Sequence, residues 1–386
     1  MAQQTALASY WMLGEESQWG VPVTPTIGLP LVPGESIKQT PQYAMSKGVI
    51  AGAGVMRSTQ KAIVGYDTGG SIPLEMNDRS MSLLFKHMFG TQTGSGPYTC
   101  TPVGGSLNGK GLTIQKGVPA NDGTVLPLTQ VGSKIGSWEL AFAAREIATL
   151  GLDTVGRHLI DYRTVADGVT TSGQPTVTSA TAVFSLDDVG KPISGTGIPA
   201  SSYIGVVNSA TSVGLSSSAL TNTPVNASAS GTAITFNIGI AAVAASYAAG
   251  IGIGMVGTYG SVLVAGTEYK VNKFSLKGNN GLDDRKFAND GFISEPLESK
   301  LRDYTLTLDS ELFSAVASQR IRNGAEVALV ANLAAGSSTV QITVNAFYKG
   351  DTPTVGDTDV VKQPLTLQVA APSTDASGIT AVISAA

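Results

Sequence analysis

Residues 71–90 read SIPLEMNDRSMSLLFKHMFG, and this stretch decides the fold class. Its first part alternates apolar and other residues with the period of a strand that buries one face, at Ile72, Leu74 and Met76. The period then changes to that of a helix with one apolar side, formed by Met81, Leu84, Phe85 and Met88. Asn77 or Asp78 can cap this helix, and Gly90 can end it. The stretch therefore predicts a strand that leads directly into a short amphipathic helix.

A second stretch, residues 300–321, repeats this order of strand and helix. Its apolar residues alternate at Tyr304, Leu306 and Leu308. Asp309 or Ser310 can then cap a helix that carries Leu312, Phe313, Val316 and Ile321. Six positions of the two stretches match at a constant offset, from Ile72 with Tyr304 to Leu84 with Val316. A single match of this kind can arise by chance, so an internal duplication and a coincidence both stay open.

The composition divides the chain into three segments, 1–167, 168–235 and 236–386. The outer segments carry further strand-like runs at 36–42, 98–102, 112–116, 137–143, 146–152, 269–277, 326–332, 339–347 and 365–371. The middle segment has no charges besides Asp187, Asp188 and Lys191, and short β-branched runs alternate in it with turns. This pattern predicts a small β-sandwich or hairpin module, with unfolded low complexity as the alternative. The chain as a whole is therefore expected to be mainly β, with short flanking helices.

The charge content indicates a surface that other copies cover. Charged residues make up 13% of the chain, about half of the usual share, so burial between copies is expected. The net charge of −4 argues against tight nucleic-acid binding, which needs clustered basic residues. Cys100 is the single cysteine, which excludes an intramolecular disulfide and fits assembly in a reducing cytoplasm. Residues 1–18 contain no basic region followed by an apolar run, so we expect no secretory signal.

An uncharged stretch at residues 236–266 is long enough to cross a membrane as a helix. It consists largely of Ala, Gly, Ser and Tyr, and glycine at this density disfavours a helix. We therefore expect no membrane span, and instead strands and loops buried in a subunit interface.

No catalytic or metal-binding pattern appears. His87 and His158 are the only histidines, and neither belongs to a metal-ligand spacing. The adjacent acids Asp187–Asp188 and Asp283–Asp284 are expected in solvated turns, because neighbours on a strand point to opposite faces. The glycine run at 250–254 is not followed by the residues of a phosphate loop. We therefore expect no enzyme, no cofactor and no metal.

Several short motifs resemble the tail-tube proteins of long-tailed, siphovirus-type phages. Residues 14–22, GEESQWGVP, resemble the "GxExxxGT" opening of that family, with Val21 where the family has Thr. Residues 70–76, followed by Leu83–Leu84 and Phe89–Gly90, resemble its strand and barrel-closing helix. Residues 112–117 resemble its next strand, and 277–282, KGNNGL, its Asn-Asn-Leu turn with Gly281 as an extra residue. The resemblance covers both outer segments.

The middle segment resembles a different kind of unit. Residues 189–200, VGKPISGTGIPA, and 203–208, YIGVVN, are similar to the decoration modules of phage virion proteins, many of which are Ig-like. The resemblance implies an inserted Ig-like β-sandwich at 168–235 that projects outward.

The resemblance also implies a function. Tail-tube units form a tube β-barrel whose stacked rings deliver DNA to the host, and six units usually complete a ring. The ring would hold three chains with pseudo-sixfold symmetry if both outer segments are units, and six chains otherwise. The implied partners are further copies, a tape-measure protein and tail-end proteins, and DNA would pass without specific binding. The implied location is the virion tail, assembled in the host cytoplasm.

Residues 43–59, rich in Gly and Ala, are expected to form a mobile arm that contacts the next ring through Tyr43, Lys47, Arg57 and Thr59. Three other classes remain open. A receptor-binding protein or adhesin would share the middle module and the low charge, although the aromatic content of 6% is small for a binding face. A capsid decoration protein would lack the two strand–helix units, and a cell-wall hydrolase would need an acid–base constellation.

Overall fold

The computed structural model describes residues 9–30, 32–48, 55, 57–77, 81–120, 122–247, 255, 261–288, 290–311, 319, 323–350, 362–372 and 377–384. Strands dominate these residues, which confirms the mainly β prediction. The strand and helix predicted at 71–90 are also present. They are β4 (Lys61–Glu75) and α1 (Met81–Phe89), and the backbone N–H of Gly90 closes the helix on the carbonyl of Lys86.

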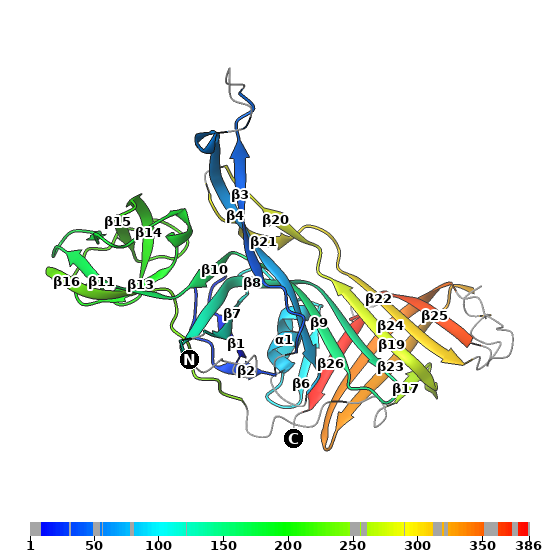
Figure 1. Ribbon diagram of the computed structural model, residues 1–386. Coiled ribbons are helices and arrows are strands. Elements are labelled where there is room, and N and C mark those ends of the chain that lie inside the picture. The colour runs from blue at the N-terminus through cyan, green and yellow to red at the C-terminus, as the bar shows by residue number, and fades with distance from the viewer. Residues whose placement is uncertain are drawn as a thin grey trace.

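Most strands belong to one large antiparallel sheet, which together with α1 we call the body (Figure 1). The strands from the first part of the chain pair in the order β3–β4–β9–β8–β7–β1–β2, and β10 also pairs with β8. Besides β4, these strands are β1 (Tyr10–Glu16), β2 (Ile27–Leu29), β3 (Lys38–Met45), β7 (Gly111–Pro119), β8 (Val125–Ala143), β9 (Thr149–Gly156) and β10 (His158–Asp161). Two short strands, β5 (Thr91–Thr93) and β6 (Tyr98–Thr101), follow the helix.

The last part of the chain repeats this order of pairing. Its strands pair as β19–β22–β25–β24–β23–β17–β18, and β26 also pairs with β24. They are β17 (Val262–Val264), β18 (Thr267–Glu268), β19 (Val271–Asn279), β22 (Asp303–Glu311), β23 (Glu326–Ala335), β24 (Ser338–Gly350), β25 (Lys362–Val369) and β26 (Ile379–Ser384). A separate hairpin, β20 (Leu282–Arg285) with β21 (Ser294–Glu298), lies between β19 and β22. Each half thus has the same seven-strand order plus one added strand.

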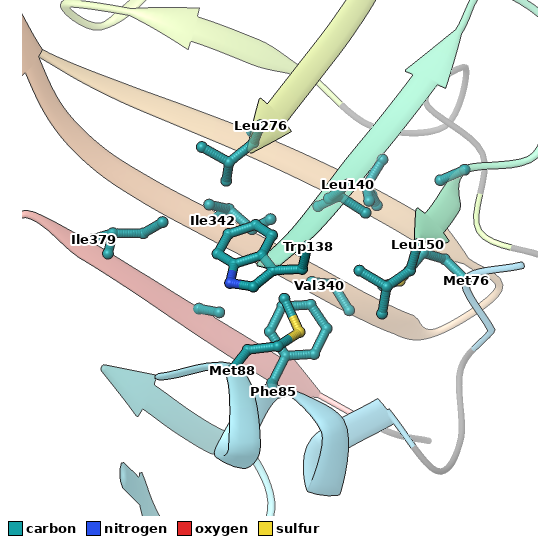
Figure 2. Close-up of a cluster of buried hydrophobic side chains, with 14 of the residues drawn as sticks. Met76, Phe85, Met88, Trp138, Leu140, Leu150, Leu276, Val340, Ile342 and Ile379 are labelled. Atoms are coloured by element: carbon teal, nitrogen blue, oxygen red, sulfur yellow. The ribbon is translucent and has the colours of Figure 1, made fainter. Parts of the chain in front are cut away.

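The two halves meet where β8 pairs with β19, from Ser137 opposite Asn279 to Ala143 opposite Lys273. Side chains from both halves form one core behind this joint (Figure 2). Trp138 of β8 lies edge-on to Phe89 of α1 at 5.5 Å and 5.9 Å from Tyr304 of β22. Burying three aromatic side chains contributes about 2–3 kcal/mol each, so this cluster holds the halves together.

The second predicted helix cannot start where the sequence analysis placed it. Asp309 and Ser310 belong to β22, opposite Pro364 and Gln363 of β25, so they are not helix caps. The long-range ladder with β25 has overridden the local capping signal, because it holds Asp309 and Ser310 in an extended strand. Most of the expected helix lies outside the described residues, although Gln319 and Asn323 are helical.

The middle of the chain folds as a unit with its own core, which we call the barrel module. Six strands close into an antiparallel barrel in the order β11–β12–β15–β14–β13–β16. They are β11 (Arg163–Thr170), β12 (Thr176–Thr178), β13 (Pro192–Gly195), β14 (Ser202–Ser209), β15 (Ser212–Ser216) and β16 (Gly231–Ile238). The module lies to one side of the body (Figure 1).

This architecture corrects the expectation of an Ig-like sandwich at 168–235. The sheet closes because β16 pairs with β11 on one edge and, through Phe236 and Ile238, with β13 on the other, so two separate sheets do not form. The module also begins earlier and ends later than expected, at Arg163 and Ile238, since Val165 and Ile238 belong to its core.

We predict that Gly278→Ala destabilises the body. A Cβ at Gly278 would lie 2.3 Å from Cε2 of Trp138, and overpacking of a well-filled core costs about 1–3 kcal/mol. Urea unfolding should show a lower midpoint for this variant. Gly151→Ala in β9 is the matched control, since its Cβ would approach nothing closer than 4.0 Å. Equal midpoints for the two variants would contradict the proposed tight contact.

Candidate functional site

The residues expected to contact a neighbouring ring lie on a hairpin that projects from the body (Figure 1). We call this hairpin, residues 38–48 and 57–69 of β3 and β4, the arm. Tyr43, Lys47, Arg57 and Thr59 are all exposed on it. Strand pairing on the arm reaches Met45 opposite Lys61, so the first residues of the predicted arm belong to β3. Residues 49–54 and 56 of the predicted arm lie outside the described residues.

The arm presents apolar side chains to solvent. Tyr43 is 44% exposed and lies opposite Ile63, which is 43% exposed. Further exposed apolar residues of this segment are Met45, Val55 and Val64. Sequence reasoning singled out Tyr43 but missed the others, although an apolar run without a core partner was visible in the sequence. Residues 36–66 also contain four basic side chains and no acidic one. The cluster of exposed apolar side chains is typical of a surface that another protein covers.

The base of the arm is held firmly. The ring of Tyr66 stacks on that of Phe292 at 5.5 Å, and the Tyr66 N–H donates to the carbonyl of Gly291. Lys286 Nζ lies 2.7 Å from Asp67 Oδ1. The hairpin is therefore stiff where it leaves the body.

The face of the body sheet that points away from the core is polar. Neighbouring strands β4, β9, β8, β19 and β22 form a shallow groove of about 420 Å³ on this face. Its lining includes Ser71, Ser137, Glu139, Asp153, Lys277, Asn279, Asp303 and Thr305. Sequence reasoning did not find this face, because β8 and β19 are far apart in the chain.

The charge of this polar face is mainly acidic. Glu139, Asp153 and Asp303 line the groove, and Lys277 is its one basic residue among those described. Lys277 Nζ is 3.4 Å from Glu139 Oε2, and Ser137 donates to Asp153. Two carboxylates therefore remain without a basic partner on the face, which disfavours adhesion of a polyanion.

The 14–22 motif has a structural role centred on the buried carboxylate of Glu16. It accepts hydrogen bonds from the backbone N–H groups of Gly20 and Gly132 and from the Thr113 hydroxyl, at 2.7–2.9 Å. Trp19 Nε1 donates to the carbonyl of Gly132 at 2.7 Å. The motif thus ties the chain after β1 to β7 and β8. Desolvation by burial raises the pKa of Glu16 to about 7.

Both histidines are buried, and each lies beside a carboxylate. His87 Nε2 is 3.3 Å from Glu15 Oε1, and the hydrogen bond lowers the pKa of Glu15 to about 2. His158 Nε2 is 3.3 Å from Asp187 Oδ1. Burial lowers the pKa of both imidazoles. Among the described residues, no three His, Cys, Asp or Glu side chains gather in a way that could hold a metal ion.

Asp187 and Asp188 were expected in a solvated turn, but they surround a buried lysine instead. Lys191 is fully buried, and its ammonium group lies 2.6 Å from Asp187, 3.2 Å from Asp188 and also against Asp161. Arg163 makes a second ion pair with Asp188 at 2.9 Å. A buried ammonium needs carboxylates to offset its desolvation. One of these carboxylates, Asp161, ends β10 of the body, so the cluster joins the body to the barrel module. Asp283 and Asp284 are exposed but lie in β20.

None of the helices in the described part of the chain is both long and apolar enough to cross a membrane. The stretch at 236–266 includes the end of β16 and all of β17, with 248–254 and 256–260 outside the described residues.

We predict that Lys191→Met strongly destabilises the joint between body and barrel module. The substitution removes the buried ammonium that Asp161, Asp187 and Asp188 share and leaves the buried Asp188 with Arg163 alone, and breaking a buried ion pair costs about 3–5 kcal/mol. Lys277→Met is the matched control, since its exposed pair with Glu139 contributes at most about 1 kcal/mol. Denaturant unfolding of the two variants measures the difference, and similar midpoints would show that the cluster does not hold the joint.

A pH dependence should follow from Glu16. The folded-state pKa of about 7 lies above the ordinary 4.5, so between these pH values the folded chain keeps a proton on Glu16 that the unfolded chain has lost. The free energy of unfolding therefore falls as the pH rises from 4.5 to 7. At 1.36 kcal/mol per pKa unit, the loss is about 3 kcal/mol. The unfolding free energy of Glu16→Gln should lack this fall, whereas the exposed control Glu139→Gln should retain it. Parallel curves for Glu16→Gln and the unchanged protein would refute the assignment.

No protein-family model matches this sequence, and no curated protein is detectably similar to it.

Proposed function

We propose that this chain is a structural, non-enzymatic subunit of a phage tail tube. Copies close into rings, the rings stack, and DNA passes through the lumen. The observation that carries the proposal is the repeated order of strand pairing in the body. It supports two equivalent units in one chain, already joined as neighbouring units of a ring would be.

The joint between β8 and β19 serves as the template for a joint between chains. The two halves can be related strand by strand through their paired residues. In the first half, Leu74 of β4 pairs with Leu150 of β9, which pairs with Leu140 of β8. In the second half, Leu306 of β22 pairs with Leu367 of β25, which pairs with Tyr348 of β24. β24 is therefore the counterpart of β8. β23 covers one edge of β24 as far as Phe347, whereas β24 continues to Gly350. This extension corresponds to the part of β8 that carries β19.

The complementary edge lies at the other end of the sheet. β3 covers β4 only from Lys61 to Gly69, and beyond it the segment 32–37 runs beside β4. The N–H of Ser36 donates to the carbonyl of Ser71 there, so this segment occupies the position that β19 has in the second half.

We infer that the end of β24 in one copy pairs with segment 32–37 of the next. Such a head-to-tail contact uses two different surfaces of each chain, so it produces a ring when the rotation closes. Three chains supply six units, and a closed ring leaves no strand edge unpaired. Of the two stoichiometries that the sequence leaves open, the repeat favours three.

The remaining surfaces fit the same function. The polar face would line the lumen, where its acidic side chains repel DNA within the screening distance of about 8 Å. The arm, with its exposed apolar residues, would reach the adjoining ring. The expected partners beyond further copies are a tape-measure protein and tail-end proteins, in a virion tail assembled in the host cytoplasm.

Ring formation should depend on the end of β24. Negative-stain electron microscopy and mass photometry of the purified chain should show rings or short tubes, with a smallest closed species about three times the chain mass of 39.4 kDa. Lys349→Pro removes a backbone N–H at the proposed joint and should leave monomers. Lys349→Ala keeps that N–H and should assemble normally.

Circular dichroism and unfolding midpoints must match between these two variants, so that loss of assembly is not loss of folding. Rings of six chains, or unchanged rings for Lys349→Pro, would overturn the proposed joint. A compact trimer without a central hole would instead favour an adhesin.

A further inference from the structure

A second cavity, of about 350 Å³, lies where the barrel module meets the body and plays no part in the proposed ring. The module contributes the loop 218–222 between β15 and β16, together with Val189 and Ile204. The body contributes Arg157, which follows β9, together with Phe287, Asp290 and Ser294. Ligand sites in proteins often lie in such crevices between domains.

Arg157 gives the cavity a buried group with unused hydrogen-bond donors. Its side chain is 5% exposed, and its guanidinium lies 5.3 Å from the ring centre of Phe292. Its only hydrogen bond from the guanidinium to the described residues runs from Nη1 to the carbonyl of Ala219 at 3.2 Å. No carboxylate among the described residues forms an ion pair with it. A guanidinium has five N–H donors, so most of them are free for a ligand.

The other polar groups on the walls of the cavity accept hydrogen bonds, or both donate and accept them. Asp290 lines the cavity, and one of its carboxylate oxygens accepts only the N–H of Phe292. Asn222 also lines it, and its side-chain amide makes no hydrogen bond to the described residues. Ser294 adds a hydroxyl group. The cavity therefore offers donors and acceptors from several directions.

Phe287 supplies an apolar wall to the same cavity. Its side chain is 49% exposed, which is unusual for a phenylalanine, and the guanidinium of Arg285 lies 5.4 Å from its ring centre. A half-exposed aromatic ring beside free polar groups fits a ligand with one apolar and one polar side.

We propose that this cavity binds a saccharide, with one neutral sugar ring seated between Phe287 and the polar residues Arg157, Asn222 and Asp290. The hydroxyl groups of a sugar both donate and accept, so they can pair with the guanidinium, the amide and the carboxylate together. The C–H face of the sugar would lie on Phe287. A simple anion would meet the carboxylate of Asp290, and an apolar ligand would leave Arg157 and Asn222 without partners, at a cost of about 1–3 kcal/mol for each buried group.

Saturation-transfer NMR on the full-length protein tests this inference, with maltose and N,N′-diacetylchitobiose as probes at millimolar concentration. We expect at least one disaccharide to receive saturation, with Phe287→Ala and Asn222→Ala each weakening binding about tenfold or more. Both side chains are exposed, so the variants should fold. Tyr247→Ala, an aromatic of similar exposure, and Asn208→Ala, an exposed amide of the same module, are the matched controls.

Absence of transfer to both disaccharides would overturn the inference, as would transfer that persists unchanged in Phe287→Ala and Asn222→Ala. Binding of inorganic phosphate without either sugar would also overturn it, because the cavity would then be an anion site. The result is separable from the ring proposal. Rings without sugar binding refute only this inference, and sugar binding by a chain that forms no rings refutes only the other.

Discussion

The edges of a β-sheet impose the constraint on which the rest of this structure depends. Every edge strand carries backbone N–H and C=O groups that need partners. At the centre of the body, β8 and β19 satisfy each other from Ser137 to Ala143, so two half-sheets become one. That joint also places Trp138 against Phe89 and Tyr304, which creates a single core on one side and a continuous polar face on the other.

The barrel module obeys the same constraint in a different way. Its six strands close on themselves, so the insertion between β10 and β17 brings no strand edge that could compete with the edges of the body. Its orientation depends on charge instead, because Lys191 is buried among carboxylates from both units. A buried cation tolerates little displacement from its partners. The ion pairs therefore fix the orientation of the module on the body more narrowly than apolar packing alone would. The cavity beside Arg157 exists only because the module is held in this position.

The surfaces left over after folding differ in chemistry, and this difference is what suggests a function. The arm exposes apolar side chains, as surfaces that associate with protein do. The polar face carries more carboxylates than basic groups, so it repels a polyanion. The ends of the body sheet carry backbone groups suited to strand pairing with another copy. A subunit that assembles at its edges, stacks through its arm and encloses its polar face uses all of these surfaces together.

The change of period at residues 71–90 allowed β4 and α1 to be predicted from the sequence alone. The sequence also placed the arm. It misjudged Asp309, where a cap signal lost to the ladder with β25, and Asp187, which forms an ion pair with the buried Lys191. Only the tertiary structure decided the barrel closure, the repeated pairing order and the polar face. Periodicity reports which side of a strand is buried, but the partner of each edge is chosen by contacts between residues far apart in the chain.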